Sequence, residues 1–284
     1  MVFLNVFTFP DGGMEFDFFR GALRTCYNTY YPFQVLSKHG FERIDFEPIT
    51  ILYGGNGSGK TTALNVIAEK TGVQRESVFN KSNFFPDYVQ LCEMQLGDDI
   101  PKHSRIITSD DVFDYMLNIR NLNEGIDLKR EDLFDEYLEA KYSKFQMKTL
   151  EDYEQLKASQ QAKSKTQSRY VKSQLMKNVR EFSNGESAFL YFSEQINERG
   201  LYLLDEPENS LSPKKQMELA EYIVESMKIF NCQFIISTHS PFFLGITGAK
   251  IYDMDENPVY VKRWTELENV RIYFNFFKKF EKEF

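Results

Sequence analysis

A glycine-rich stretch near the start of the chain ends in a lysine and two threonines. The stretch, GGNGSGKTT, fits the pattern G-x-x-x-x-G-K-[ST]. Glycines let the backbone fold tightly, so that successive N–H groups point inward at phosphate oxygens, and a helix beginning there adds its positive end. We expect Lys60 to reach the β- and γ-phosphates of a nucleotide and the Thr61 hydroxyl to sit on Mg²⁺. The residues assigned to this site are Gly54, Asn56, Gly57, Ser58, Gly59, Lys60, Thr61 and Thr62.

Two acidic residues follow an apolar run in LYLLDEPE. Leu201–Leu204 read as a buried strand, and Asp205 falls at its carboxyl end, where open α/β sheets bind ligands. Asp205 can coordinate the metal, and Glu206 can polarise a water aimed at the γ-phosphate. The alternative is a pair of solvated acids in a loop.

His239 ends a second apolar run, FIISTHS. Its strand end is expected near Asp205, so we predict a γ-phosphate contact for its side chain rather than a capping role. The other two histidines, His39 and His103, are interpreted as structural. Tyr30 and Tyr31 precede the glycine-rich stretch at a distance suited to stacking on adenine, but core packing is the favoured interpretation.

The elements around these residues predict an α/β fold with a mostly parallel sheet flanked by helices. ITILYGG, from Ile49 to Gly55, reads as a buried strand, and the residues from Thr61 read as a helix that stops at Gly72. We expect β elements in the first fifty residues and irregular structure from Gln74 to Pro101. After them come a short strand with a helix cap, a helical insert, and alternating strands and helices.

The insert carries a concentrated positive charge. Seven Lys and Arg and no acid lie between Lys157 and Arg180, although the whole chain has a net charge of -8. This basic stretch is the local feature that would support nucleic-acid binding, and a solvated helix face is the alternative. The overall acidity argues against a protein that coats DNA along its whole surface.

The composition is that of an ordinary globular protein, with 42% apolar and 27% charged residues among 284. No apolar run approaches the ~18 residues of a membrane helix, so no membrane association is expected. The cysteines Cys26, Cys92 and Cys232 are far apart and form no metal pattern. We interpret them as thiols of a cytoplasmic protein.

The order of the motifs resembles that of the ABC-type ATPases. The glycine-rich loop is followed by FSNGE (Phe182–Glu186), LLDEPE and STHSP. The sequences of the last two motifs are closest to those of the stand-alone predicted ATPases and of the RecF, SMC and OLD branch of that family. The resemblance implies a P-loop ATPase that binds ATP and Mg²⁺, with Glu206, His239 and Lys60 as catalytic residues.

In that family a signature motif binds the γ-phosphate of ATP held by the other subunit. By resemblance this role falls on Ser183, Gly185 and Glu186, and an ATP-dependent homodimer is implied. Asn184 departs from the usual glycine, and Asn is the residue other than Gly that best tolerates a positive φ.

Two further family features have counterparts in this sequence. ENSLSP, from Glu208 to Pro213, matches the loop that crosses between subunits. The family's glutamine loop has no obvious counterpart; Ser109, Asp110 and Asp111 are the first candidates and Gln90 is the alternative.

The resemblance implies one ABC-type domain over residues 1–284. Residues 1–110 and 200–284 would form the nucleotide-binding core, and residues 111–199 a helical subdomain carrying the signature. Three functions stay open: an ATPase switch or motor for a partner or effector, including one in phage defence; an ATP-gated binding module; and a nucleic-acid-binding ATPase of the repair type. A transporter motor is the least favoured.

Overall fold

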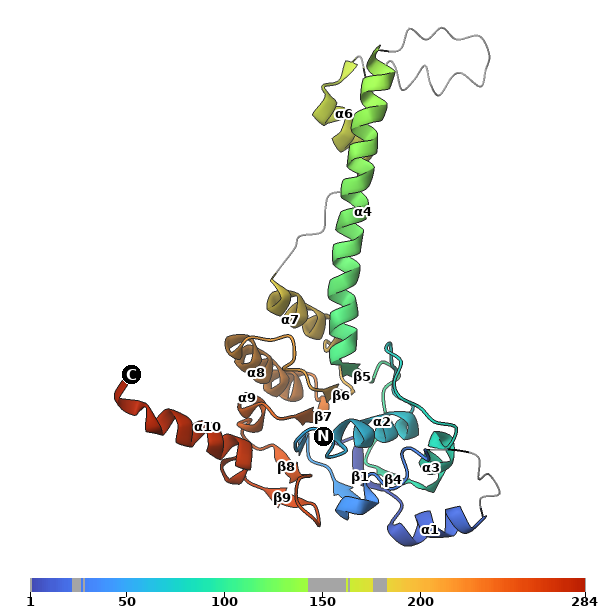
Figure 1. Ribbon diagram of the computed structural model, residues 1–284, viewed down its shortest axis with the longest axis vertical. Coiled ribbons are helices and arrows are strands. Elements are labelled where there is room, and N and C mark those ends of the chain that lie inside the picture. The colour runs from blue at the N-terminus through green and yellow to red at the C-terminus, as the bar shows by residue number, and fades with distance from the viewer. Residues whose placement is uncertain are drawn as a thin grey trace. The chain divides into compact units, whose positions relative to one another are not determined.

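The main sheet contains six strands in the order β5-β6-β7-β3-β8-β9 (Figure 1). The protein is represented by a computed structural model that describes residues 2–21, 27, 29–142, 162, 164–175 and 183–283. The strands are β3 (Ile49–Tyr53), β5 (Arg105–Thr108), β6 (Leu201–Asp205), β7 (Gln233–Thr238), β8 (Lys250–Asp253) and β9 (Tyr260–Lys262). Neighbouring strands are parallel except β8 and β9, which form an antiparallel hairpin. Every residue of β3, β6 and β7 is buried, because the sheet is covered on both faces and apolar side chains follow one another without alternation.

The register of these strands brings their carboxyl ends to one level. Thr108 of β5 pairs with Asp205 of β6, Asp205 with Ser237 of β7, and Ser237 with Leu52 of β3. Residues that directly follow these positions therefore gather at the same edge of the sheet.

Helices flank this sheet, as the sequence predicts. They are α2 (Lys60–Thr71), α7 (Asn184–Gln195), α8 (Pro213–Ile229) and α9 (Pro241–Leu244). α10 (Glu268–Lys279) contacts mainly the short 3-10 turns η3 (Trp264–Glu266) and η4 (Glu281–Glu283), and a further 3-10 turn is η1 (Ser37–His39). α2 packs against β6 and β7, and α8 packs against β7, α7 and α9. Gly72 ends α2 with a φ of 69°, the left-handed conformation that a helix stop requires. The α/β prediction is confirmed.

A second, antiparallel sheet has the order β2-β1-β4. Its strands are β1 (Leu4–Thr8), β2 (Arg43–Asp45) and β4 (Glu93–Leu96). The fully buried Gln233, at the start of β7, joins it to the main sheet: Oε1 accepts from the N–H groups of Phe3 (2.8 Å) and Leu4 (2.9 Å), and Nε2 donates to the Leu4 carbonyl (2.9 Å). One amide side chain thus satisfies three buried backbone groups.

The strands β1 and β2 confirm the β elements expected in the first fifty residues, but two helices were not expected. The first fifty residues contain a helix, α1 (Gly12–Gly21), because Asp11 acts as its N-cap and accepts the Met14 N–H at 2.7 Å. The segment from Gln74 to Pro101 contains α3 (Phe85–Leu91) and β4. α3 buries Phe85, Tyr88 and Val89, so tertiary packing stabilises a helix too short to show a clear period.

The chain divides into two compact units, Met1–Phe113 with Asn184–Phe284, and Asp114–Ser183. The second unit holds most of α4 (Ser109–Tyr142) and α6 (Gln167–Gln174), with a small apolar cluster around Leu133, Tyr137 and Tyr170. α7, which we expected in a helical subdomain of residues 111–199, groups with the first unit. None of the helices in the described ranges has the length and apolarity needed to cross a bilayer.

Candidate active site

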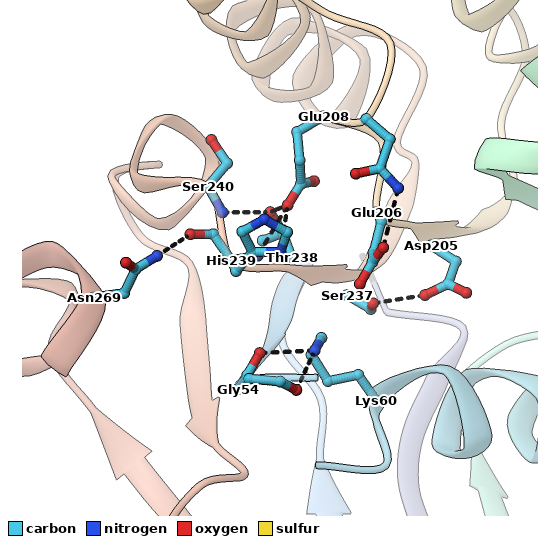
Figure 2. A network of polar contacts seen from close by, with 12 residues as sticks. Gly54, Lys60, Asp205, Glu206, Glu208, Ser237, Thr238, His239, Ser240 and Asn269 are labelled. Atoms are coloured by element: carbon cyan, nitrogen blue, oxygen red, sulfur yellow. Dashed lines mark hydrogen bonds and ion pairs between the residues drawn. The ribbon is translucent and has the colours of Figure 1, made fainter. Parts of the chain in front are cut away.

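The loop between β3 and α2 is shaped by its glycines. Gly59 has a φ of 94°, and a Cβ on Gly54 would lie 2.5 Å from the Ser58 Oγ, so neither position accepts a side chain without rearrangement. Lys60, the first residue of α2, is buried and donates from Nζ to the carbonyl oxygens of Gly54 (2.7 Å) and Gly55 (2.9 Å), as Figure 2 shows. Both acceptors are neutral, so these two bonds do not themselves neutralise the positive charge of Lys60. The loop, the helix start and the ammonium together suit an anion.

Thr61 and Asp205 meet beside this loop. The Asp205 Oδ1 accepts from the Thr61 Oγ1 at 3.1 Å and from the Ser237 Oγ at 2.6 Å. Burial raises the pKa of Asp205, and these two hydrogen bonds oppose the rise.

A carboxylate and a hydroxyl are oxygen ligands of the kind that Mg²⁺ prefers. The described ranges hold no cluster of three or more His, Cys, Asp or Glu that could bind a metal. Mg²⁺ bound with a nucleotide is usually held by one or two protein groups together with phosphates and waters. Asp205 and Thr61 are therefore a suitable pair for Mg²⁺ bound with a nucleotide.

Glu206 has a left-handed backbone with a φ of 48°. Such a conformation costs a residue other than Gly about 1–3 kcal/mol and is often found at functional sites. Its N–H donates to the Ser237 carbonyl at 2.9 Å, and its carboxylate accepts from the Asn209 Nδ2 at 3.0 Å (Figure 2). Both bonds fix the glutamate directly after Asp205.

Glu208 holds the end of β7 and was not singled out by the sequence. It is 6% exposed, and its Oε1 accepts from the Thr238 Oγ1 at 2.6 Å and the His239 N–H at 2.9 Å. The His239 Nδ1 lies 3.4 Å from the same oxygen, and Asn269 at the start of α10 donates to the His239 carbonyl at 2.8 Å. The backbone of His239 is thus held on both sides, its imidazole lies beside Glu208, and 45% of the side chain stays exposed.

The predicted signature lies at the start of α7. Asn184 is the first residue of the helix and has no positive φ, so the left-handed turn considered for it is not adopted. A Cβ on Gly185 would lie 3.7 Å from the Ser210 carbonyl oxygen and 3.9 Å from the Ser212 nitrogen. The signature therefore packs against the loop that follows Glu206.

The sequence pattern of the family described as "ABC transporter" matches residues 43–209, more than half of the chain. The chain belongs to the ABC-type ATPases. A second pattern, described as "AAA ATPase domain", matches residues 184–244. The protein is accordingly an ATPase, a P-loop enzyme that hydrolyses ATP.

Among curated proteins, the tungstate uptake system ATP-binding protein TupC of Campylobacter jejuni is 25% identical over 214 residues, which are 74% of this chain and 54% of TupC. The chain thus spans about half the length of this relative.

Two solved structures are similar to this ABC-type ATPase. The Smc head domain of Pyrococcus furiosus, with an extended coiled coil and the bound C-terminal domain of ScpA, is 13% identical, with 84% and 95% of the two chains covered and a TM-score of 0.39. A nucleotide-free ATP-binding cassette from an ABC transporter is 14% identical, with 82% and 87% covered and a TM-score of 0.39.

The candidates for the glutamine-loop position, Ser109–Asp111, directly follow β5. Thr108 caps α4 together with Asp111: the Asp111 Oδ2 accepts the Thr108 N–H at 2.7 Å, and the Thr108 Oγ1 accepts the Asp111 N–H at 3.4 Å. Because Thr108 pairs with Asp205, Ser109–Asp111 follow at the same edge of the sheet as Glu206. Gln90 is exposed on α3 instead. The assignment to Ser109–Asp111 stays a prediction, favoured by this placement.

The remaining candidates are the two tyrosines before the glycine-rich loop and the basic stretch, which lies partly outside the described residues. Tyr30 and Tyr31 pack against the core, and the Tyr31 hydroxyl is 3.2 Å from the Thr62 Oγ1. Of the basic stretch, Lys165, Arg169 and Lys172 are described, whereas Lys157, Lys163, Lys177 and Arg180 fall outside the described residues, as does Cys26.

Two residues of the site, Ser237 and Glu208, were not predicted from the sequence, although each is a polar residue beside a buried strand end. Ser237 is a polar residue within the fully buried β7, one position before its end. Glu208 is an acid in a buried stretch between Pro207 and an exposed Asn209. Buried polar side chains near a strand end are hydrogen-bonded as a rule, so both could have been expected to hold neighbouring groups.

Proposed function

We propose that this ATPase is an ATP-dependent dimer switch. Two chains enclose two Mg·ATP, hydrolyse them and separate, and a partner protein responds to the change. The signature residues Ser183, Gly185 and Glu186 of one chain contact the γ-phosphate bound by the other. Binding energy of the γ-phosphate then favours the paired state, and hydrolysis removes it.

Within one site each residue has a distinct task. The N–H groups of the loop from Gly54 to Gly59 cradle the phosphates, and Lys60 neutralises the β- and γ-phosphates. Thr61 and Asp205 hold Mg²⁺, which supplies charge neutralisation on the phosphates when bound. Glu206 orients and polarises the attacking water, and His239 stabilises charge on the γ-phosphate.

The observation that supports the proposal is the set of contacts made by the loop after Glu206. Through Asn209 this loop holds the Glu206 carboxylate at 3.0 Å, and through Glu208 it holds the His239 N–H at 2.9 Å. Its backbone at Ser210 and Ser212 packs against the signature glycine. A second chain that touches this loop would therefore act on the water-activating residue, the γ-phosphate residue and the signature together.

An effector protein is the partner that we propose for the switch, and a role in phage defence belongs to that proposal. Both rest on the resemblance to stand-alone ATPases that accompany effector proteins. A cytoplasmic location stays a prediction. The name of TupC suggests tungstate uptake for that relative; an acid in place of the glutamine-loop residue argues against the same coupling in this chain.

Nucleic-acid binding is the second candidate, favoured by the basic stretch from Lys157 to Arg180. Arg169 and Lys172 are exposed on α6. Neutralising Lys163, Lys165 and Arg169 should abolish salt-dependent binding of DNA or RNA if this candidate is right. Binding that is unchanged in this triple variant, or absent from the parent, would remove it.

A mixing experiment tests the composite site. Lys60→Ala disables the phosphate loop and Ser183→Arg the signature, so each variant alone should be inactive. In an equal mixture half of the dimers pair the two variants, and each such dimer has one intact site of two, so about a quarter of the parental turnover should return. A mixture as inactive as its components would contradict a site shared between two chains.

A further inference from the structure

α10 exposes large apolar side chains to an unusual degree. Five of its residues are between 44% and 61% exposed, namely Ile272, Tyr273, Phe274, Phe276 and Phe277, and Val270 is its only buried residue. Soluble proteins rarely expose a contiguous apolar patch of this kind unless it binds something. α10 therefore needs an explanation beyond the nucleotide site.

One side of α10 forms the wall of a groove of about 760 Å³. Phe274 and Phe277 line it from α10, Trp264 from η3 and Phe242 from α9. Glu208 and His239 also line the groove, which gives it a polar part between aromatic walls. Its volume is in the range of ligand-binding pockets. Its concave form suits a ligand that inserts side chains, and suits the flat surface of a bilayer less well.

The charges on α10 indicate what kind of chain would fit. Arg271 and Lys278 are seven residues apart, so they lie on the same side of the helix, two turns from each other. Arg271 lines the groove, and Lys278 lines an adjoining hollow with Phe274, Phe277 and the acidic Glu281. Neither is in any of the ion pairs found among the described residues. A ligand with carboxylates beside its apolar residues would complement both cations.

We propose that this groove binds an amphipathic helix of a partner protein, with acidic side chains flanking its apolar face. The apolar residues of that helix insert between Phe274, Phe277 and Trp264, and its carboxylates face Arg271 and Lys278. This is the helix-in-groove mode, in which apolar anchors at i, i+3, i+4 and i+7 give affinity and flanking charges give selectivity.

The groove lies beside His239 and the start of the phosphate loop, so a docked helix can influence the ATP site through α10. Asn269, in the first turn of α10, donates from Nδ2 to the His239 carbonyl (2.8 Å) and from its backbone N–H to the Tyr53 hydroxyl (3.1 Å). Tyr53 directly precedes Gly54 of the phosphate loop. Docking itself does not depend on the proposed dimer cycle, so its test stands apart from ATP turnover.

Trp264 is the only tryptophan of the chain, so its fluorescence reports on the groove directly. The full chain without nucleotide is titrated with a synthetic amphipathic helix of about five turns, with leucines on one face and glutamates beside them. A second peptide has the same leucines but lysines in place of the glutamates. Phe274→Ser removes a wall of the groove, and the matched control Phe276→Ser changes an equally exposed phenylalanine that does not line it.

The acidic peptide should shift the Trp264 emission to shorter wavelength with saturation, and the basic peptide should bind at least about fivefold more weakly. Phe274→Ser should weaken the acidic peptide more than about tenfold, and Phe276→Ser should not. No saturable shift, equal binding of both peptides, or equal effects of the two variants would overturn the proposal. So would anionic vesicles, or a second copy of the chain detected by light scattering, that occupied the groove in a Phe274-dependent manner.

Discussion

Replacing Glu208 should damage both stability and turnover, because one carboxylate holds two groups at the end of β7. Glu208→Ala leaves the Thr238 hydroxyl and the His239 N–H without their acceptor. Each orphaned buried group costs about 1–3 kcal/mol. The substitution also removes a buried carboxylate, whose Oε2 has no partner among the described residues. Removing the desolvation cost of that carboxylate offsets part of the loss. We expect a net loss of about 2–4 kcal/mol in the free energy of unfolding.

Glu208→Gln separates the hydrogen bonds from the charge. The glutamine oxygen can still accept from Thr238 and His239, so the free energy of unfolding should change by about 1 kcal/mol or less. Turnover should fall more than about tenfold in Glu208→Ala, because His239 loses its anchor, and less in Glu208→Gln.

The assay is urea unfolding without nucleotide, combined with steady-state ATP hydrolysis. The matched control is Glu221→Ala, which removes an exposed carboxylate from α8 and should change the free energy of unfolding by no more than about 0.5 kcal/mol. Glu208→Ala with the stability and turnover of this control would refute the anchoring role.

Three further predictions concern buried groups. Burial raises the pKa of Asp205, so ionisation of this carboxyl destabilises the metal-free fold above the ordinary carboxyl pKa, and the destabilisation fades as pH falls. Asp205→Asn should therefore raise the thermal midpoint at neutral pH, and raise it by less at acidic pH. The same variant should abolish the stabilisation of the fold by Mg·ATP. Gln233→Leu should lower the free energy of unfolding by about 3–5 kcal/mol, measured in urea, because three buried backbone groups lose their partner; a loss below about 1 kcal/mol would contradict this. Burial raises the pKa of Cys92 to about 12 and of Cys232 to about 11, so mass spectrometry should find both unmodified by iodoacetamide at pH 8 until the protein is unfolded.

The nucleotide-binding half of the fold could be predicted because its signals are local. β3, the glycine-rich loop and α2 follow one another within a short stretch, and Gly72 marks the helix end with a left-handed φ. Buried parallel strands such as β6 and β7 leave long apolar runs that need no knowledge of their neighbours. Their common edge then follows from topology alone.

The parts that escaped prediction depend on contacts distant in sequence or on a misread local signal. β4 is mostly exposed and only four residues long, so its polar–apolar alternation is too short to identify a strand, and its pairing with β1 defines it. α1 escaped prediction because a sequence such as Asp11-Gly12-Gly13 is typical of a turn, whereas here Asp11 caps a helix. The role of Glu208 at His239 depends on a contact across thirty-one positions, which spacing does not show.

Sizing the Glu206→Gln variant with and without Mg·ATP tests the central claim most directly. Without its water-activating carboxylate the chain should bind ATP but not remove the γ-phosphate, so the paired state should accumulate. Light scattering should give about twice the 33.4 kDa mass of the chain with Mg·ATP, and the single mass with Mg·ADP. A Glu206→Gln variant that stays at the single mass with saturating Mg·ATP, or that hydrolyses ATP as fast as the parent, would contradict the account.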